Sequence, residues 1–164
     1  MTQSKARPTS SRRPDAHGLD AAGLQILDRE ACLAVLARGG VGRIAINVGA
    51  LPLILPVRFA LDGERVVVRV RQGSTLERAT QDTVVAFEAD DLGPAEGWSI
   101  SFVGLARHLP DSGDVGPGVR LALPHWGGDG EHLLVGISTE HVSGRRIDPS
   151  DRIAEAGPPS SSET

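Results

Sequence analysis

The residues best suited to chemistry lie together at the end of a predicted strand. Arg69 and Arg71 are two positions apart, so their guanidinium groups share one face of that strand. The chain then passes through Gly73 to Ser74 and Thr75, which begin a short predicted helix. Guanidinium groups, hydroxyls and the free N–H groups at the start of a helix are donors that bind a phosphate group. Ser74 and the glutamate three positions later also form a capping box, which needs no ligand, so both interpretations stay open.

Few other residues have the types and spacing that catalysis or metal binding requires. The five histidines show no short ligand spacing, and the single cysteine, Cys32, has no CxxC partner. Cys32 falls in the apolar stripe of a predicted helix, so we expect a small core residue rather than a nucleophile. The motifs of serine hydrolases, P-loop proteins and dinucleotide-binding folds are missing from the sequence. We therefore expect no metal site and assign no catalytic side chain.

Composition narrows the class of protein. A chain of 164 residues, 40% apolar and 23% charged, predicts one globular domain. Its longest apolar run, residues 50–57, is far shorter than the roughly 20 residues of a membrane-spanning helix, so we expect no membrane partner. A formal charge of -4 and only three Phe and two Trp weigh against nucleic-acid binding. The lone cysteine and the lack of an apolar leader predict a cytoplasmic protein.

The elements that must position these residues follow from hydrophobic periodicity. Residues 1–23 and 148–164 lack periodic apolar residues and are predicted to be disordered tails, which leaves residues 24–147 as the domain. A helix is predicted over residues 29–38, with Asp28 as its N-cap, and a second over residues 74–80. Alternation of apolar residues predicts six strands, over residues 41–48, 51–61, 65–71, 83–89, 98–109 and 132–142.

Six strands and two short helices indicate a mostly β protein. A doubly wound sheet is excluded, because each parallel connection needs a crossover of a dozen or more residues and most connections here are shorter. The predicted fold is a six-stranded antiparallel split β-barrel with short flanking helices. Pro52 and Pro56 share one strand, which indicates a place where the barrel splits or bends.

The order of the motifs resembles that of the FMN-binding split β-barrel family related to pyridoxamine 5'-phosphate oxidase. The matching run covers about residues 27–147 and reads VGRIAI, LPVRFALDGERVVVRV, GSTL, VVAFEAD, GWSISFVGLA, a Trp-containing loop and VSGRRI. The resemblance implies a homodimer that holds FMN in two sites at the subunit interface. It also implies a small-molecule substrate, whose identity the sequence does not reveal.

The resemblance further implies which residues contact the cofactor. The FMN phosphate is expected near the exit of the third predicted strand, and the ring against the second and fifth. The implied residues are Val57 and Arg58 beside the ring; Arg69, Val70, Gly73, Ser74 and Thr75 at the phosphate, where Arg71 joins them by its spacing; Trp98, Ser99 and Ser101 at the polar edge of the ring; and Trp126 and Arg145 from the partner subunit. Hydrophobic packing remains an alternative role for both tryptophans.

Two positions depart from the family pattern. The family commonly has Lys where this chain has Thr75, and a shorter polar residue where it has Arg58. Threonine carries no charge, so a phosphate here depends on Arg69, Arg71 and the helix end. The expected function is that of an FMN-dependent oxidoreductase, with the flavin supplying the chemistry. A deazaflavin in place of FMN and a non-catalytic flavin-binding module both remain open.

Overall fold

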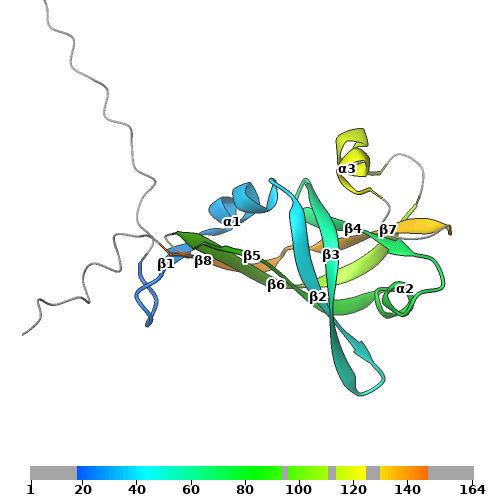
Figure 1. Ribbon diagram of the computed structural model, residues 1–164, viewed down its shortest axis with the longest axis horizontal. Coiled ribbons are helices and arrows are strands. Elements are labelled where there is room, and N and C mark those ends of the chain that lie inside the picture. Colours follow the sequence, from blue (N-terminus) through cyan, green and yellow to red (C-terminus); the bar gives the residue numbers. More distant parts are fainter. Residues whose placement is uncertain (1–17, 94–95, 111–113, 125–129, 148–164) are drawn as a thin grey trace, which may run out of the picture.

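The computed structural model describes residues 18–147, apart from 94–95, 111–113 and 125–129 (Figure 1). The strands in this part are β1 (Gln25–Leu27), β2 (Gly40–Val48), β3 (Leu51–Asp62), β4 (Arg65–Arg71), β5 (Thr83–Leu92), β6 (Gly97–Leu109), β7 (His132–Ser138) and β8 (His141–Ile147). The helices are α1 (Arg29–Leu36), α2 (Thr75–Ala79) and α3 (Pro117–Ala122). Both predicted helices are confirmed, whereas β1 and α3 were not predicted.

Six strands close into an antiparallel barrel, which confirms the predicted fold. Around the barrel they follow the order β2, β3, β4, β7, β6 and β5, and β5 pairs with β2 to close the ring. β6 reaches beyond the barrel, and there β8 and then β1 extend the sheet. α1 lies against this extension, whereas α2 and α3 lie at the opposite end of the molecule (Figure 1).

The single strand predicted over residues 132–142 is wrong, because this segment forms two strands. β7 pairs with β4 and with the last residues of β6, and the chain then turns at Thr139 and Glu140. β8 runs back along the first half of β6. The turn contains neither Gly nor Pro, so the residues that usually mark a turn do not show the break in the sequence.

β6 changes partner from β8 to β7 near its middle. Gly104 lies at this point, and a Cβ there would stand 1.9 Å from the carbonyl oxygen of Ser138, so only glycine fits without a backbone shift. The next amide, that of Leu105, donates to the hydroxyl of Ser138 at 3.0 Å. This side-chain acceptor takes the place of a backbone carbonyl where the neighbouring strand changes.

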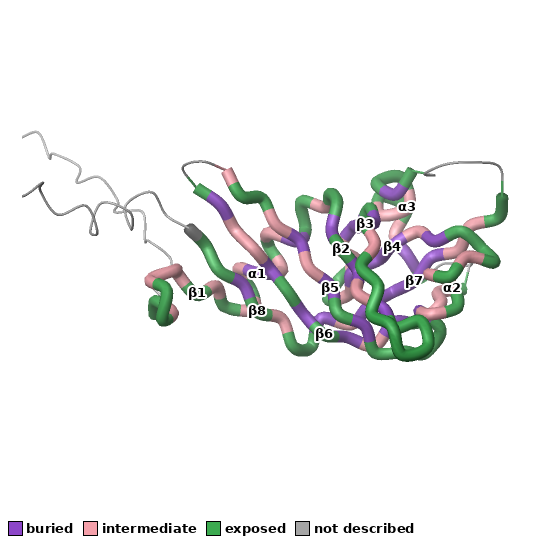
Figure 2. The backbone as a smooth tube through the Cα atoms, turned by 60° about the horizontal axis from the view of Figure 1, so that its bottom comes forward, coloured by how far each residue is buried: buried purple, intermediate pink, exposed green. Residues whose placement is uncertain are grey.

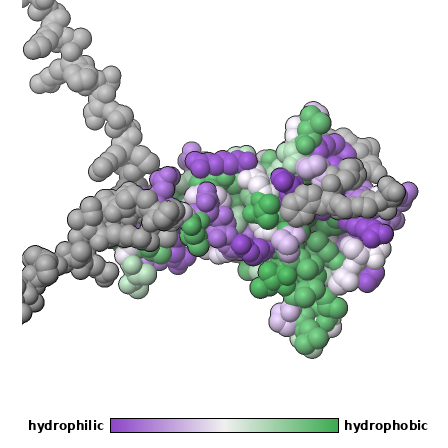
Figure 3. Space-filling model, in the orientation of Figure 1, coloured by the Kyte–Doolittle hydropathy of each residue, from purple (hydrophilic) through white to green (hydrophobic). Residues whose placement is uncertain are grey.

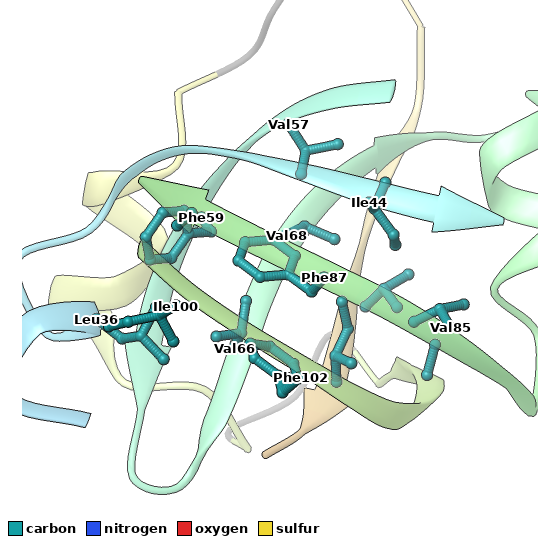
Figure 4. Close-up of a cluster of buried hydrophobic side chains, with 14 of the residues drawn as sticks. Leu36, Ile44, Val57, Phe59, Val66, Val68, Val85, Phe87, Ile100 and Phe102 are labelled. Atoms are coloured by element: carbon teal, nitrogen blue, oxygen red, sulfur yellow. The ribbon is translucent and has the colours of Figure 1, made fainter. Parts of the chain in front are cut away.

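Aliphatic side chains and three phenylalanines fill the barrel. Phe87 packs edge to face against Phe59, with ring centroids 5.3 Å apart, and stacks on Phe102 at 5.0 Å (Figure 4). Buried and exposed residues alternate along the strands (Figure 2), as the period of two predicts. Burying each such side chain contributes about 1.5–3 kcal/mol. The barrel interior is therefore a packed core, and ligands must bind on its outer surface.

The barrel splits beside the β2–β3 hairpin. β3 pairs with β2 from Leu51 to Phe59, but with β4 only from Phe59 onward. The outer part of the hairpin therefore stands away from the barrel (Figure 1). Pro52 and Pro56 lie in this part of β3, where one edge of the strand pairs with none of the described strands. This confirms the split that the two prolines predict.

Residues 18–23, which the sequence assigns to the N-terminal tail, are attached to the sheet. The carboxylate of Asp20 accepts hydrogen bonds from the backbone amides of Ala22 and Leu24, at 2.9 and 3.0 Å, and from Nε of Arg145 on β8 at 2.6 Å. These hydrogen bonds lower the pKa of Asp20, and the largest contribution comes from the Leu24 amide, followed by that of Arg145. A tail boundary at residue 23 missed this turn, which backbone hydrogen bonds also close, from the Asp20 amide to the Leu24 carbonyl at 2.9 Å and from the Gly23 amide to the Asp20 carbonyl at 3.0 Å. The rest of the predicted tails, residues 1–17 and 148–164, lies outside the described residues.

Candidate functional site

The end of β4 presents two arginines on the outer surface of the barrel, as the alternation predicts. Val70 between them is buried in the core, whereas Arg69 is half-buried and Arg71 is exposed. Nε of Arg69 donates to the carbonyl oxygen of Leu123, just after α3, at 2.7 Å. This bond uses one of the five guanidinium donors and fixes the side chain. The side chain of Arg71 makes no hydrogen bond or ion pair within the part of the chain that the structure describes.

The turn after β4 exposes its backbone. Gly73 has a φ of +76°, and a Cβ on it would meet nothing within 4 Å. Ser74 caps α2, because its hydroxyl accepts from the amide of Glu77 at 3.1 Å, which confirms the capping role. α2 is only five residues long, so its dipole adds little to the charge of this corner. Thr75 is exposed, and the positive charge of the corner comes from arginines.

The predicted residues of β3 lie beside those of β4. Phe59 pairs with Val68, so Arg58 stands opposite Arg69, one position past the last paired residues. Val57 stands opposite Val70 in the same way, and both valine side chains point into the core. Any ligand contact of these two residues is therefore made by their main chain. The split between β3 and β4 brings together residues that the sequence assigns to the ring and to the phosphate.

The remaining predicted residues form a second group on β6 and β8. Ser99 pairs with Arg145 in the ladder, and the Ser101 and Ser143 hydroxyls are 3.4 Å apart. β5 and β2 lie between β6 and β3, so β6 and β3 are three strand spacings apart along the sheet, roughly 14 Å at ~4.8 Å per spacing. One chain therefore does not place all the predicted residues in one cluster.

The two tryptophans have different outcomes. Trp98 is partly buried and packs against the core cluster, which favours the packing role. Trp126 lies outside the described residues.

A hollow of about 440 Å³ lies on the outer face of the sheet, where Ser101 and Ser143 of the second group line it. Its floor combines the small side chains of Ala45 on β2 and Ala86 on β5, which pair directly. At its rim, Arg43 donates to Glu88 at 2.9 Å and to Asp90, and these carboxylates, Asp90 first, raise the pKa of Arg43. The hollow depends on strand register, so sequence reasoning missed it. The only signal in the sequence was the outward phase of the two alanines.

The size and lining of the hollow suit a flat organic ligand. Ligand pockets in proteins have volumes of about 300–1,000 Å³, with mostly apolar walls and a few polar groups. Three described side chains have pKa values that the protein clearly shifts, and all three move away from neutrality: Asp20 is lowered, and Cys32, mainly by its burial, and Arg43 are raised. Only Arg43 of these three lines the hollow.

Two further features follow from the described residues. They contain no group of three His, Cys, Asp or Glu side chains that is arranged to hold a metal ion. None of their helices has the length and apolar character needed to cross a membrane.

Comparison with known proteins identifies the family. The sequence profile of the pyridoxamine 5'-phosphate oxidase family matches residues 28–146. The chain belongs to this family. An uncharacterized protein of Mycobacterium tuberculosis, Rv0080, is 38% identical over 128 residues, which are 74% of this chain and 84% of that protein.

Solved structures agree with this assignment. The chain is similar to an FAD-binding protein of Mycobacterium smegmatis, with 30% identity, a TM-score of 0.65 and coverage of 74% of this chain and 98% of that one. An FAD-binding protein of Mesorhizobium loti shares the fold at 22% identity and a TM-score of 0.58, over 75% of this chain and 96% of that one. The family and the split-barrel fold predicted from the motif order are therefore confirmed.

Proposed function

We propose that this protein binds a flavin on the outer surface of its barrel and acts as a flavin-dependent oxidoreductase. The observation that carries the proposal is the pair of arginines at the end of β4, where Arg69 is held by Leu123 and Arg71 has no described partner. These two guanidinium groups lie at the surface next to the open turn at Gly73, and such a cluster of positive charge favours an anionic ligand. The family membership and the FAD-binding relative that is 30% identical support a flavin.

The flavin and the protein have separate roles in this proposal. A bound flavin supplies the redox chemistry, and the protein supplies binding and orientation. Arg69 and Arg71 bind the phosphate, and the apolar floor at Ala45 and Ala86 supports a flat ring system. The first choice of cofactor is FMN, and the substrate is a small molecule of unknown class. The buried, unpaired Cys32 is compatible with the reducing cytoplasm in which we expect the protein to act.

A second copy of the chain is the proposed partner. Apolar side chains gather on the β2–β3 hairpin (Figure 3), where Leu51 is 74% and Ile54 65% exposed. Val103 on β6, which lines the hollow with Ile54, is 49% exposed. A two-stranded ribbon with exposed aliphatic residues is only marginally stable alone, and contiguous apolar surface favours an interface. In a dimer, the surface near Ser99 and Arg145 of one copy would approach Arg69, Arg71 and Gly73 of the other copy.

The first test is a flavin titration of the purified protein. We expect FMN to bind in the micromolar range or tighter and Arg71→Ala to weaken it about ten- to a hundredfold, because a hydrogen bond to a charged group contributes about 1.5–3 kcal/mol. The same variant should change the affinity for riboflavin little, because riboflavin lacks the phosphate. Arg107→Ala is the matched control, since Arg107 is 66% exposed and pairs with Asp82 on the surface. No binding of FMN or FAD below millimolar concentration rejects the proposal.

The dimer is tested separately by sedimentation. Ile54→Glu and Val103→Glu should each convert the dimer to a monomer and, at the same time, lower the affinity for the flavin. A wild-type monomer at micromolar concentration would reject an interface site.

A non-catalytic flavin-binding module is the second candidate. The observation that favours it is Thr75, an uncharged residue where the family commonly has Lys, together with the lack of an assigned catalytic side chain. Anaerobic reduction by NAD(P)H or by a reduced deazaflavin separates the two candidates. Reduction of the bound flavin by either donor supports the oxidoreductase, whereas a flavin that no donor reduces supports the module. Mass spectrometry of the cofactor that copurifies with the protein distinguishes FMN, FAD and a deazaflavin.

A further inference from the structure

The place where β3 leaves β4 puts two arginines on one surface. Ala60 and Val67 are a paired position, and both pack under α3 on the outer side of the sheet. Side chains two positions along each strand share that face, which places Arg58 and Arg69 next to each other in the direction of the split. Arg58 is exposed, in keeping with this outward position.

We propose that Arg58 is a third phosphate-binding residue, which supplies the positive charge that Thr75 lacks. This inference rests on the proposed function and deepens it. The family resemblance implies that Arg58 lies beside the ring, whereas the register places it across the split from the arginines of β4. An arginine at this position is therefore a determinant of phosphate recognition.

The distances across the split are within the reach of arginine side chains. Opposed residues of a paired antiparallel ladder have Cα atoms ~4.5–5.5 Å apart, and long side chains still interact at the ~7–8 Å of diagonal neighbours. Arg58 and Arg69 are one step past the end of their ladder, so the strands have only begun to diverge. A phosphate bound at the split can contact both guanidinium groups.

The charge balance explains why a third arginine is useful. A phosphate monoester carries close to two negative charges at neutral pH. Arg69 uses Nε to hold the end of α3, and the α2 dipole is small, so of the two β4 arginines it is Arg71 whose guanidinium makes no hydrogen bond or ion pair with the described residues. Arg58 adds a full positive charge with forked donors, which match the geometry of phosphate oxygens.

The test compares FMN and riboflavin binding to the full-length protein. We expect Arg58→Ala to weaken FMN binding at least about tenfold and riboflavin binding less than about twofold. Arg58→Lys keeps the charge without the fork and should lie between the two. Arg107→Ala again serves as the control. Equal loss of FMN and riboflavin would place Arg58 at the ring and overturn the inference, as would an unchanged FMN affinity.

A double variant that moves the positive charge from position 58 to position 75 provides the second measurement. Thr75→Lys in the Arg58→Ala background puts a cation back at the exposed corner after Gly73. We expect it to restore FMN affinity to within about threefold of the wild type, while riboflavin affinity stays the same. Failure of the rescue, with Arg71→Ala still weakening FMN, rejects the role of Arg58 and leaves the proposed function standing. A wild-type protein that binds no flavin rejects both.

Discussion

Thr139 connects three separate parts of the chain at one end of the barrel. Its side chain is 1% exposed, and its hydroxyl donates to the carbonyl oxygen of Glu64, in the β3–β4 turn, at 2.6 Å. The hydroxyl accepts from Nη2 of Arg29, at the start of α1, at 3.3 Å, and Nη1 of Arg29 donates to the Thr139 carbonyl oxygen. A single hydroxyl therefore links α1 to two turns of the barrel.

Thr139→Val removes this hydroxyl with little change in side-chain volume. The neutral bond to Glu64 contributes about 1 kcal/mol, and the bond from the charged Arg29 is weaker than usual because it is long. Leaving buried polar groups without partners adds to the loss, so we expect a decrease of about 2 kcal/mol in the free energy of unfolding. For a chain of this size, that lowers Tm by about 4–8 °C.

Equilibrium urea unfolding is the assay, because a change in midpoint at constant slope reports stability alone. Thr139→Ser keeps the hydroxyl and should recover more than half of the loss. Thr83→Val is the matched control, since the Thr83 hydroxyl bonds Gln81 at an exposed position, and we expect a change below about 0.5 kcal/mol. The reasoning is refuted if Thr139→Val lies within 0.5 kcal/mol of the wild type, a limit of about the usual error, or if Thr139→Ser is as unstable as Thr139→Val.

Three further predictions concern other parts of the fold. Gly104→Ala should destabilise the protein by more than about 3 kcal/mol or prevent folding, because its Cβ would overlap the Ser138 carbonyl, whereas Gly118→Ala, with open space around it, should change stability by less than about 0.5 kcal/mol in urea unfolding. The lowered pKa of Asp20 stabilises the fold above its ordinary value of 3.8, and this contribution is lost as the pH falls through the folded pKa, so Asp20→Asn should lower Tm more at pH 7 than in acid, as thermal unfolding at a series of pH values measures. Burial raises the pKa of Cys32, so its thiol should react with a disulfide reagent at pH 8 only as fast as the protein unfolds, and rapid labelling of the native protein would contradict this.

The segment from Arg69 to Thr75 was predictable because its structure is local. Alternation decides the face of each β4 residue, a glycine supplies the positive φ after the strand, and Ser74 caps the helix that follows. The same holds for α1, where Asp28 accepts from the Ala31 amide at 2.7 Å and Cys32 is buried. Neighbouring residues determine each of these features, so the sequence carries them in one short window.

Features that depend on distant parts of the chain were harder to predict. The hollow exists because Ala45 and Ala86, from strands far apart in sequence, meet in the β2–β5 ladder, and no local pattern specifies that register. The β7–β8 turn lacks the Gly or Pro that usually marks a turn, so its residues do not show that one predicted strand is two. Asp20 was assigned to a tail because its partner, Arg145, lies 125 positions away.

Arg58 shows where these two kinds of information meet. Alternation correctly places it on the outer face of its strand, but alternation alone does not determine which strand it faces there. That depends on where β3 loses its pairing with β4, and the prolines at positions 52 and 56 mark only the region in which this happens. The last paired residues are Phe59 and Val68, and the same register continued by one position sets Arg58 across from Arg69. The family resemblance implies that Arg58 lies beside the ring, whereas the register supports our proposal that it binds the phosphate, and the FMN and riboflavin titrations measure which of these descriptions governs binding.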